Sequence, residues 1–207
     1  MRKVIVGAFV SLDGVMQAPG GPQEDTSGGF EHGGWVAGYF DETIAKFMDE
    51  DFAKPFDLLL GRRTYDIFNA YWPPVGEDPS AQNHSIGAAF NEAVKYVATH
   101  HPESLTWSNS EGLGDDVAGA VRKLKAGEGP PLLTQGSSEL LHQLFAAGLV
   151  DEIRLQTFPI LLGKGKRLFA DNADAAGFRI EKSAITPTGV VIATYQRSGE
   201  VKTGDFT

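Results

Sequence analysis

Three short segments of the sequence carry side chains that could bind an anion. The first is "GRRT", in which Gly61, Arg62, Arg63 and Thr64 directly follow three leucines. Glycine lets the backbone approach a ligand closely, and arginine can grip a phosphate with two parallel hydrogen bonds. A threonine near a helix start adds a hydroxyl and an N–H donor. These residues together predict a phosphate site at this point of the chain.

Two further segments extend the prediction. In "QGSSE", Gly136, Ser137 and Ser138 repeat the arrangement at a second predicted helix start, and in "THHP" Thr99 could form a wall between the two. Two helix starts that can each bind a phosphate, both following neighbouring strands, predict a dinucleotide ligand. NADPH fits better than NADH because arginine is the residue that usually binds a ribose 2′-phosphate. The alternative interpretation is that the arginines are a solvated helix start and that Ser137 is only a cap.

The elements that must position these residues alternate between strand and helix up to about residue 150, and strands follow strands after it. The sheet is therefore expected to be parallel early and antiparallel at its closing edge, in a mixed α/β fold. Ligands of such sheets bind at the carboxyl ends of the parallel strands. The patterns predict strands at 4–10, 57–61, 95–99, 105–108, 130–136 and 151–161, with two more within 178–197 joined by "TPTG".

Helices are predicted between these strands from their spacing and end signals. Asp41 is expected to cap a helix that ends near residue 52, "PPVGEDP" to end the helix that follows "GRRT", and Ser137 or Ser138 to cap another. Two more helices are expected at 86–92 and 115–127. The glycine- and proline-rich segment 17–38 is long for a connecting loop, so we expect a mobile binding loop or lid near a ligand.

Composition limits the classes of function. The 207 residues suit one domain, expected at 1–197 with a flexible tail at 198–207. A net charge of −9 argues against nucleic acid or an anionic membrane as partner. The absence of cysteine excludes thiolate chemistry, the five histidines show no i, i+4 metal spacing, and no run reaches the length of a membrane helix. We expect a cytoplasmic protein without a catalytic metal.

A family resemblance adds to these inferences. "LLLGRRTYDIF", "VATHHP" and "QGSSELLHQLFAAGLVDEIRLQTFPILLGKGKRLF" resemble the dihydrofolate-reductase-like superfamily, in the branch of the C-terminal reductase domain of the bifunctional riboflavin-biosynthesis protein. The similarity runs from "VIVGAFVSLDG" to about Tyr195. It implies a single-domain, three-layer α/β fold with a mixed, mostly parallel eight-stranded sheet and flanking helices. It also implies NADPH as hydride donor, a small heterocyclic substrate and a homodimer.

The resemblance assigns roles to the residues already singled out. Gly61, Arg62, Arg63 and Thr64 would hold the adenosine phosphates, Thr99 would lie by the 2′-phosphate, and Gly136, Ser137 and Ser138 would face the pyrophosphate. Two carboxylates are candidate catalytic residues. Asp41 or Glu42 lies about where folate reductases place a substrate carboxylate, although a plain helix cap explains Asp41 equally well. Asp13, in "SLDG", would lie on the loop over the nicotinamide, although Asp-Gly is also a common turn pair.

The predicted reaction is hydride transfer from NADPH to a C=N (or C=O) carbon of a pyrimidine- or pterin-like substrate. The resemblance is to 5-amino-6-(5-phosphoribosylamino)uracil reductase of riboflavin biosynthesis. The cofactor carries the difficult chemistry, so the protein has to align the reactants and exclude water. The alternatives are a reductase of dihydrofolate or another small molecule, and an NADPH-binding module without turnover.

Overall fold

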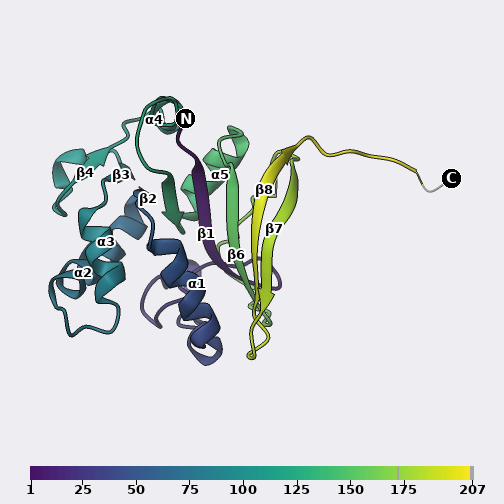
Figure 1. Cartoon of the computed structure of the whole chain (residues 1–207), viewed down its shortest axis with the longest axis horizontal. Coiled ribbons are helices and arrows are strands. Elements are labelled where there is room, and N and C mark those ends of the chain that lie inside the picture. Colours follow the sequence, from purple (N-terminus) through teal and green to yellow (C-terminus); the bar gives the residue numbers. More distant parts are fainter. Residues whose placement is uncertain (172, 206–207) are drawn as a thin grey trace.

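One eight-stranded sheet runs through the middle of the molecule (Figure 1). The computed structural model describes residues 1–171 and 173–205. The strands are β1 (Val4–Ser11), β2 (Asp57–Gly61), β3 (Lys95–Ala98), β4 (Ser110–Gly112), β5 (Leu132–Gln135), β6 (Glu152–Phe158), β7 (Gly177–Ile185) and β8 (Val191–Gly199). Their order is β4-β3-β2-β5-β1-β6-β8-β7. Strands β1 to β6 pair in parallel, whereas β8 and β7 are antiparallel, which confirms the predicted mixed sheet.

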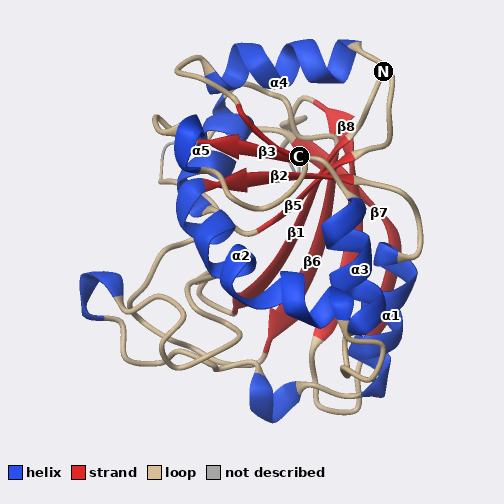
Figure 2. Cartoon of the chain, turned by 90° about the vertical axis from the view of Figure 1, so that its left-hand side faces the viewer, coloured by secondary structure: helices blue, strands red, loops and turns tan. Residues whose placement is uncertain are grey.

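Helices cover both faces of this sheet and make the expected three layers. They are α1 (Glu42–Phe52), α2 (Arg62–Glu77), α3 (His84–Glu92), α4 (Val117–Ala126) and α5 (Ser138–Ala146). Helices α4 and α5 bury Val121 and Leu141 against one face, and α1, α2 and α3 lie together along the other (Figure 2). Strand β2 is apolar throughout because both of its faces are buried. Leu59 packs on the side of α4 and α5, whereas Leu58 and Leu60 pack on the side of α1, α2 and α3.

Helix α2 is longer than its sequence predicts. The two prolines expected to end it, Pro73 and Pro74, lie inside the helix, which continues to Glu77. Its last turns pack so closely on α3 that a Cβ built on Gly76 would lie 2.5 Å from the carbonyl oxygen of Gly87. The Asn91 side chain also donates a hydrogen bond of 3.1 Å to the carbonyl of Pro73. Tertiary packing against α3 therefore outweighs the local signal of proline.

The strand predicted at 105–108 is wrong, and the ladder begins later, in β4. Trp107 is buried, and its N–H groups hydrogen-bond to side chains instead of to a neighbouring strand. Its backbone N–H donates to the hydroxyl of Tyr65 over 2.8 Å, and its indole N–H donates to Asn91 over 2.9 Å. Pairing with β3 becomes possible only after Asn109, which has a positive φ of 57°.

The long segment before α1 is anchored by a hydrophobic cluster of its own. Phe30, Trp35 and Val36 are buried against Ile44 of α1 and Phe158 of β6. Residues 27–29 and 37–39 form short 3-10 helices within the segment. The cluster fixes the end of the segment, and the Gln17 side chain at its start donates hydrogen bonds to the carbonyls of Asp25 and Ser27. The part between contributes Pro19, Gly20, Glu24 and Asp25 to the site described below.

The end of the chain differs slightly from the expected boundary. Strand β8 extends to Gly199, two residues beyond the predicted end of the domain at 197, and residues 200–205 carry no regular secondary structure. Residues 206–207 of that tail lie outside the described part of the chain. None of the helices described is both long enough and apolar enough to span a bilayer.

Candidate functional site

A cavity of about 830 Å³ opens at the carboxyl ends of the central parallel strands. Strands β2 and β5 lead directly into α2 and α5, so the two predicted helix starts meet at this edge of the sheet. All eight residues predicted to bind the cofactor line the cavity: Gly61, Arg62, Arg63, Thr64, Thr99, Gly136, Ser137 and Ser138. The tertiary structure thus brings three separate segments of the chain to one site.

The starts of α2 and α5 leave backbone donors free for a ligand. Asp41 caps α1 and Asp116 caps α4 by accepting first-turn N–H groups, and the cap at Asp41 confirms the prediction. The N-cap residues of α2 and α5 are Gly61 and Ser137, and neither makes a side-chain cap bond. Helix α3 also lacks such a bond, but its N-cap residue does not line the cavity. Unpaired N–H groups and the helix dipole favour an anion. These two starts therefore suit phosphate groups.

Ser137 does not cap its own helix, so the predicted cap at Ser137 or Ser138 is wrong. Ser137 adopts a left-handed conformation, with φ 73°, and turns its hydroxyl towards α2. The hydroxyl accepts a hydrogen bond of 2.8 Å from the backbone N–H of Gly61 and donates one of 2.8 Å to the hydroxyl of Thr64. A Cβ built on Gly61 would lie only 3.0 Å from Ser137, so glycine permits this close approach.

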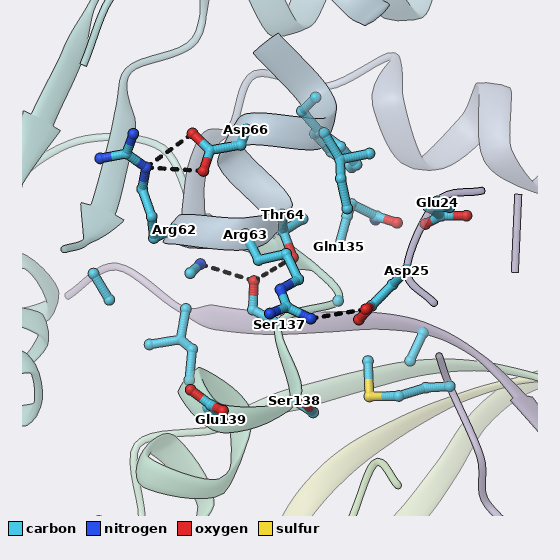
Figure 3. Close-up of a pocket in the computed structure, with 18 of the residues that line it drawn as sticks. Glu24, Asp25, Arg62, Arg63, Thr64, Asp66, Gln135, Ser137, Ser138 and Glu139 are labelled. Atoms are coloured by element: carbon cyan, nitrogen blue, oxygen red, sulfur yellow. Dashed lines mark hydrogen bonds and ion pairs between the residues drawn. The ribbon is translucent and has the colours of Figure 1, made fainter. Parts of the chain in front are cut away.

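The two arginines of "GRRT" point in different directions (Figure 3). Arg62 is held by Asp66 one turn further along α2, with Nε 2.8 Å and 3.0 Å from the two carboxylate oxygens. Its Nη1 donates to Ser104 over 2.5 Å and lies 3.5 Å from the hydroxyl of Thr99. Arg62 and Thr99 therefore form one wall of the cavity, and Arg63 is left for the opposite side.

Arg63 reaches the long loop before α1 and contacts Asp25 (Figure 3). Its Nη1 lies 2.7 Å from the Asp25 carboxylate and 2.7 Å from the hydroxyl of Ser27. Lys166, from the "GKGK" segment, binds the other Asp25 oxygen over 2.6 Å. Burial opposes the ionisation of Asp25, but hydrogen bonds from Lys166 and Ser27 outweigh it and lower the pKa of the carboxyl to about 2. We call Arg63, Asp25 and Lys166 the loop latch.

Glu24 and Gln135 also line the cavity, and sequence reasoning missed both. One Glu24 carboxylate oxygen accepts hydrogen bonds from the backbone N–H groups of Gly20 and Gly21, at 2.6 Å and 3.1 Å. Burial raises the pKa of Glu24 above its usual value in spite of these bonds. The glycine-rich loop marked the region in the sequence, but nothing in its pattern distinguished Glu24 from its neighbours.

The two predicted catalytic aspartates hold loops in place. Asp13 accepts hydrogen bonds from the Ser11 hydroxyl at 2.6 Å and from the N–H groups of Leu162 and Gly163 at 3.1 Å and 2.8 Å. The Ser11 bond contributes most to lowering the pKa of Asp13 to about 2. Besides capping α1, Asp41 accepts a bond of 3.0 Å from Thr188. Neither is among the described residues that line the cavity, so their catalytic roles stay predictions.

Comparison with known proteins assigns the chain to a family. The model of the RibD C-terminal domain matches residues 2–192. The chain belongs to the RibD C-terminal domain family. This membership confirms the resemblance found in the sequence, and it covers both helix starts and the whole sheet up to β8.

Similar proteins in the RibD C-terminal domain family include two of Bacillus subtilis strain 168. The chain is 26% identical over 199 residues to the uncharacterized protein YyaP, with 96% of each chain covered, and 24% identical over 181 residues to the uncharacterized protein YwjB, with 87% of this chain and 90% of that protein covered. Neither name describes an activity.

Two solved structures share the fold. One is a putative riboflavin biosynthesis protein from Shewanella sp. PV-4, with a TM-score of 0.63 and 19% identity over 95% of this chain and 99% of that chain. The other is a pyrimidine reductase-like protein from Corynebacterium diphtheriae, with a TM-score of 0.58 and 14% identity over 96% and 93% of the two chains. At these identities the similarity establishes a shared fold and does not establish a shared activity.

Proposed function

We propose that this member of the RibD C-terminal domain family is an NADPH-dependent reductase. It would transfer a hydride to a C=N (or C=O) carbon of a small pyrimidine- or pterin-like heterocycle. Family membership supports the reductase class. The observation that carries the proposal is the meeting of two uncapped helix starts and two arginines at one cavity of about 830 Å³.

The cavity has the chemistry that a dinucleotide phosphate requires. Backbone N–H groups in the first turns of α2 and α5 would hold the pyrophosphate, and Gly136, with φ 94°, lets the chain turn into α5 beside it. Arg62 and Thr99 lie together on one wall and would meet the 2′-phosphate that distinguishes NADPH from NADH. The cofactor, when bound, supplies the hydride.

The chain's own contribution is to align the substrate and keep water out. The cavity continues beyond the helix starts into an apolar end formed by Met48, Phe52, Phe68, Trp72 and Phe90. A flat heterocycle can pack against such side chains, since aromatic rings offer large apolar faces. The loop latch lies at the mouth of the cavity and holds residues 19–29 over it. Closure of this kind excludes water and fixes the reacting atoms.

Glu24 is the proposed source of the proton that the reduced nitrogen or oxygen takes up. It is a cavity-lining carboxyl whose pKa burial raises, so it keeps its proton at a higher pH than an exposed glutamate. Both backbone donors that bind it contact Oε2. Asp13 and Asp41, by comparison, use their carboxylates to hold loops and a helix start.

A titration of the purified protein with NADPH and NADH tests the cofactor. Trp72 lines the cavity, so its fluorescence should be quenched and should transfer energy to the nicotinamide. We expect micromolar binding of NADPH and clearly weaker binding of NADH. If neither nucleotide binds, the proposed function is wrong, even if the fold is intact.

Turnover assays then separate the remaining possibilities. NADPH oxidation is followed with 5-amino-6-(5-phosphoribosylamino)uracil and with dihydrofolate as separate substrates. Oxidation with the uracil compound supports the proposal as stated, whereas oxidation with dihydrofolate alone moves the substrate to the pterin class. Tight NADPH binding without oxidation across a broad panel would indicate a binding module instead. A homodimer is proposed from the resemblance alone, and light scattering would test it. A cytoplasmic location is proposed as well.

A further inference from the structure

A small recess lies beside the apolar end of the main cavity, on the sheet face covered by α1. Gly7, Ala8, Phe9, Met48, Phe52 and Gln135 line both spaces. Asp51, Arg154 and Gln156 line the recess alone among the described residues. Its volume is about 20 Å³, enough for one water molecule or for the edge of a ligand that fills the main cavity.

The register of the sheet explains why the recess is open. Gly7 of β1 lies opposite Gln135 of β5 on one side and opposite Arg154 of β6 on the other. A Cβ built on Gly7 would lie 2.4 Å from Nε2 of Gln135, so a side chain at this position would push the amide aside. Glycine within a strand commonly marks such a close approach. The missing side chain leaves room between Gln135 and Arg154.

An ion pair closes the recess on the α1 side. Asp51, the next-to-last residue of α1, has Oδ1 3.1 Å from Nη1 of Arg154, and Lys182 of β7 lies 4.0 Å from the same oxygen. Nε of Arg154 donates to Glu152 over 2.7 Å, which fixes the guanidinium from the sheet side. The recess therefore combines a carboxylate, a guanidinium and two amide side chains in fixed positions.

Gln156 carries a buried side-chain oxygen, Oε1, for which the described residues supply no hydrogen-bond donor. The residue is only 9% exposed. A buried acceptor left unpaired costs about 1–3 kcal/mol, and the large majority of such groups in folded proteins are paired. An N–H or O–H donor is therefore expected at this position when the site is in use.

We propose that the recess recognises the polar edge of the substrate ring and that Gln156 accepts a hydrogen bond from a ring N–H. This inference rests on the proposed function and assigns it a specificity-determining residue, which would select rings with an N–H beside a carbonyl, an edge that uracil-type and pterin-type heterocycles both carry. Gln156 and the Asp51 carboxylate supply acceptors, while Arg154 and the Gln135 amide supply donors. A site built to pair a substrate N–H discriminates strongly against an analogue that lacks it.

The test uses two soluble probes that differ only at the ring nitrogens. These are 5,6-diaminouracil and 5,6-diamino-1,3-dimethyluracil, in which methyl groups replace both ring N–H hydrogens. Binding of each probe to the NADPH-saturated protein is measured by calorimetry. We expect the wild type to bind the unmethylated probe at least about tenfold more tightly, because losing the paired N–H is worth roughly 1.4 kcal/mol or more.

Gln156→Leu separates recognition from folding. Leucine has a similar size without the acceptor, so this variant should lose the preference between the probes while its NADPH affinity stays the same. Its melting temperature should be unchanged or higher, because an unpaired buried oxygen has been removed. Asp51→Asn should weaken binding of the unmethylated probe, whereas Asp49→Asn, an exposed aspartate on the same helix, is the matched control and should behave as wild type.

The outcomes distinguish the two proposals. Equal binding of the two probes by the wild type, or a preference that survives in Gln156→Leu, would overturn the inference and leave a bound water as the partner of Gln156. If the wild type fails to bind NADPH, the proposed function fails, and the same probes are measured without cofactor. A preference that is present in the wild type and lost in Gln156→Leu still supports recognition by the recess in that case.

Discussion

Ser137 and Thr64 join the starts of α5 and α2 by a hydrogen bond of 2.8 Å between their hydroxyls, across 73 positions of sequence. The same Ser137 oxygen accepts from the N–H of Gly61. One side chain thus sets the distance between the two phosphate-competent helix starts. The cavity depends on this distance, because both helix starts must reach the same ligand.

Ser137→Ala should lower both stability and cofactor affinity. The variant leaves the Gly61 N–H and the Thr64 hydroxyl without their partner, at a cost of about 1–2 kcal/mol in the free energy of unfolding. NADPH should bind more weakly because the two helix starts are no longer linked. Urea unfolding and the fluorescence titration measure the two effects. Ser138→Ala, whose hydroxyl makes neither of these bonds, is the comparison for stability.

The double variant Arg62→Ala, Arg63→Ala should lose NADPH selectively. Hydrogen bonds to charged groups contribute about 1.5–3 kcal/mol each, so the dissociation constant for NADPH should rise at least about tenfold. The constant for NADH should rise less, since NADH lacks the 2′-phosphate and loses only the contribution of Arg63 to the loop latch. The double variant Arg122→Ala, Lys123→Ala on α4, at two exposed cations outside the cavity lining, controls for the same change in net charge. Unchanged NADPH binding in the Arg62→Ala, Arg63→Ala variant would remove the main support for the cofactor.

Asp25→Asn should loosen the loop over the cavity. The substitution removes the charge that holds Arg63 and Lys166, so residues 19–29 should be cleaved faster by a glutamate-specific protease, which can cut after the half-buried Glu24 once the loop loosens. The matched control is Asp115→Asn, whose side chain is 93% exposed and contacts only His100 among the described residues. Equal cleavage rates for wild type and Asp25→Asn would show that the latch does not hold the loop.

The latch should also depend on pH in a defined direction. The pKa of Asp25 is about 2 in the folded protein, below the ordinary value of 3.8. Its ionised form therefore stabilises the fold fully at pH values above the ordinary pKa, and this contribution disappears as the pH falls through the folded value. The difference in unfolding free energy between wild type and Asp25→Asn should be constant at neutral pH and shrink as the pH falls from about 4 to about 2.

Glu24→Gln should reduce turnover without affecting cofactor binding. Glutamine can still accept the hydrogen bonds from Gly20 and Gly21, but it has no proton to give. If Glu24 is the proton donor, kcat should fall by roughly 10²-fold or more. The wild-type rate should decline as the pH rises through the raised pKa of Glu24, and the variant should lack this dependence. Asp13→Asn, measured alongside, tests the role predicted for Asp13.

Gly76→Ala should be strongly destabilising although the residue lies far from any expected chemistry. The added methyl group would lie 2.5 Å from the backbone of Gly87, and neither helix can move without breaking their shared packing. Overpacking of this kind costs about 1–3 kcal/mol, measurable by urea unfolding. Gly38→Ala is the control, since an added Cβ there meets no atom within 4 Å. Equal stability of the two variants would contradict the close contact of α2 and α3.

Local signals in the sequence were sufficient for most elements. The alternation of strand and helix, the cap at Asp41 and the hairpin through "TPTG" were each readable because short-range hydrogen bonds and periodicity determine them. The two elements that were predicted wrongly, the end of α2 and the strand at 105–108, are those whose backbone is satisfied by distant partners. Asn91, far from both in sequence, binds the carbonyl of Pro73 and the indole of Trp107.

The sequence by itself determined the fold class, the family and the three segments that line the cavity, because glycine, arginine and helix-start residues have the same chemistry wherever they occur. Only the tertiary structure decided what those residues do. It turned Ser137 from a cap into a link to α2, and it brought Asp25 and Lys166 onto Arg63. It also placed Gln156, whose Oε1 has no hydrogen-bond partner in the described part of the chain, in the recess that Gly7 and Arg154 line. These relationships join residues far apart along the chain, and they depend on sheet register and loop path, which no local pattern encodes.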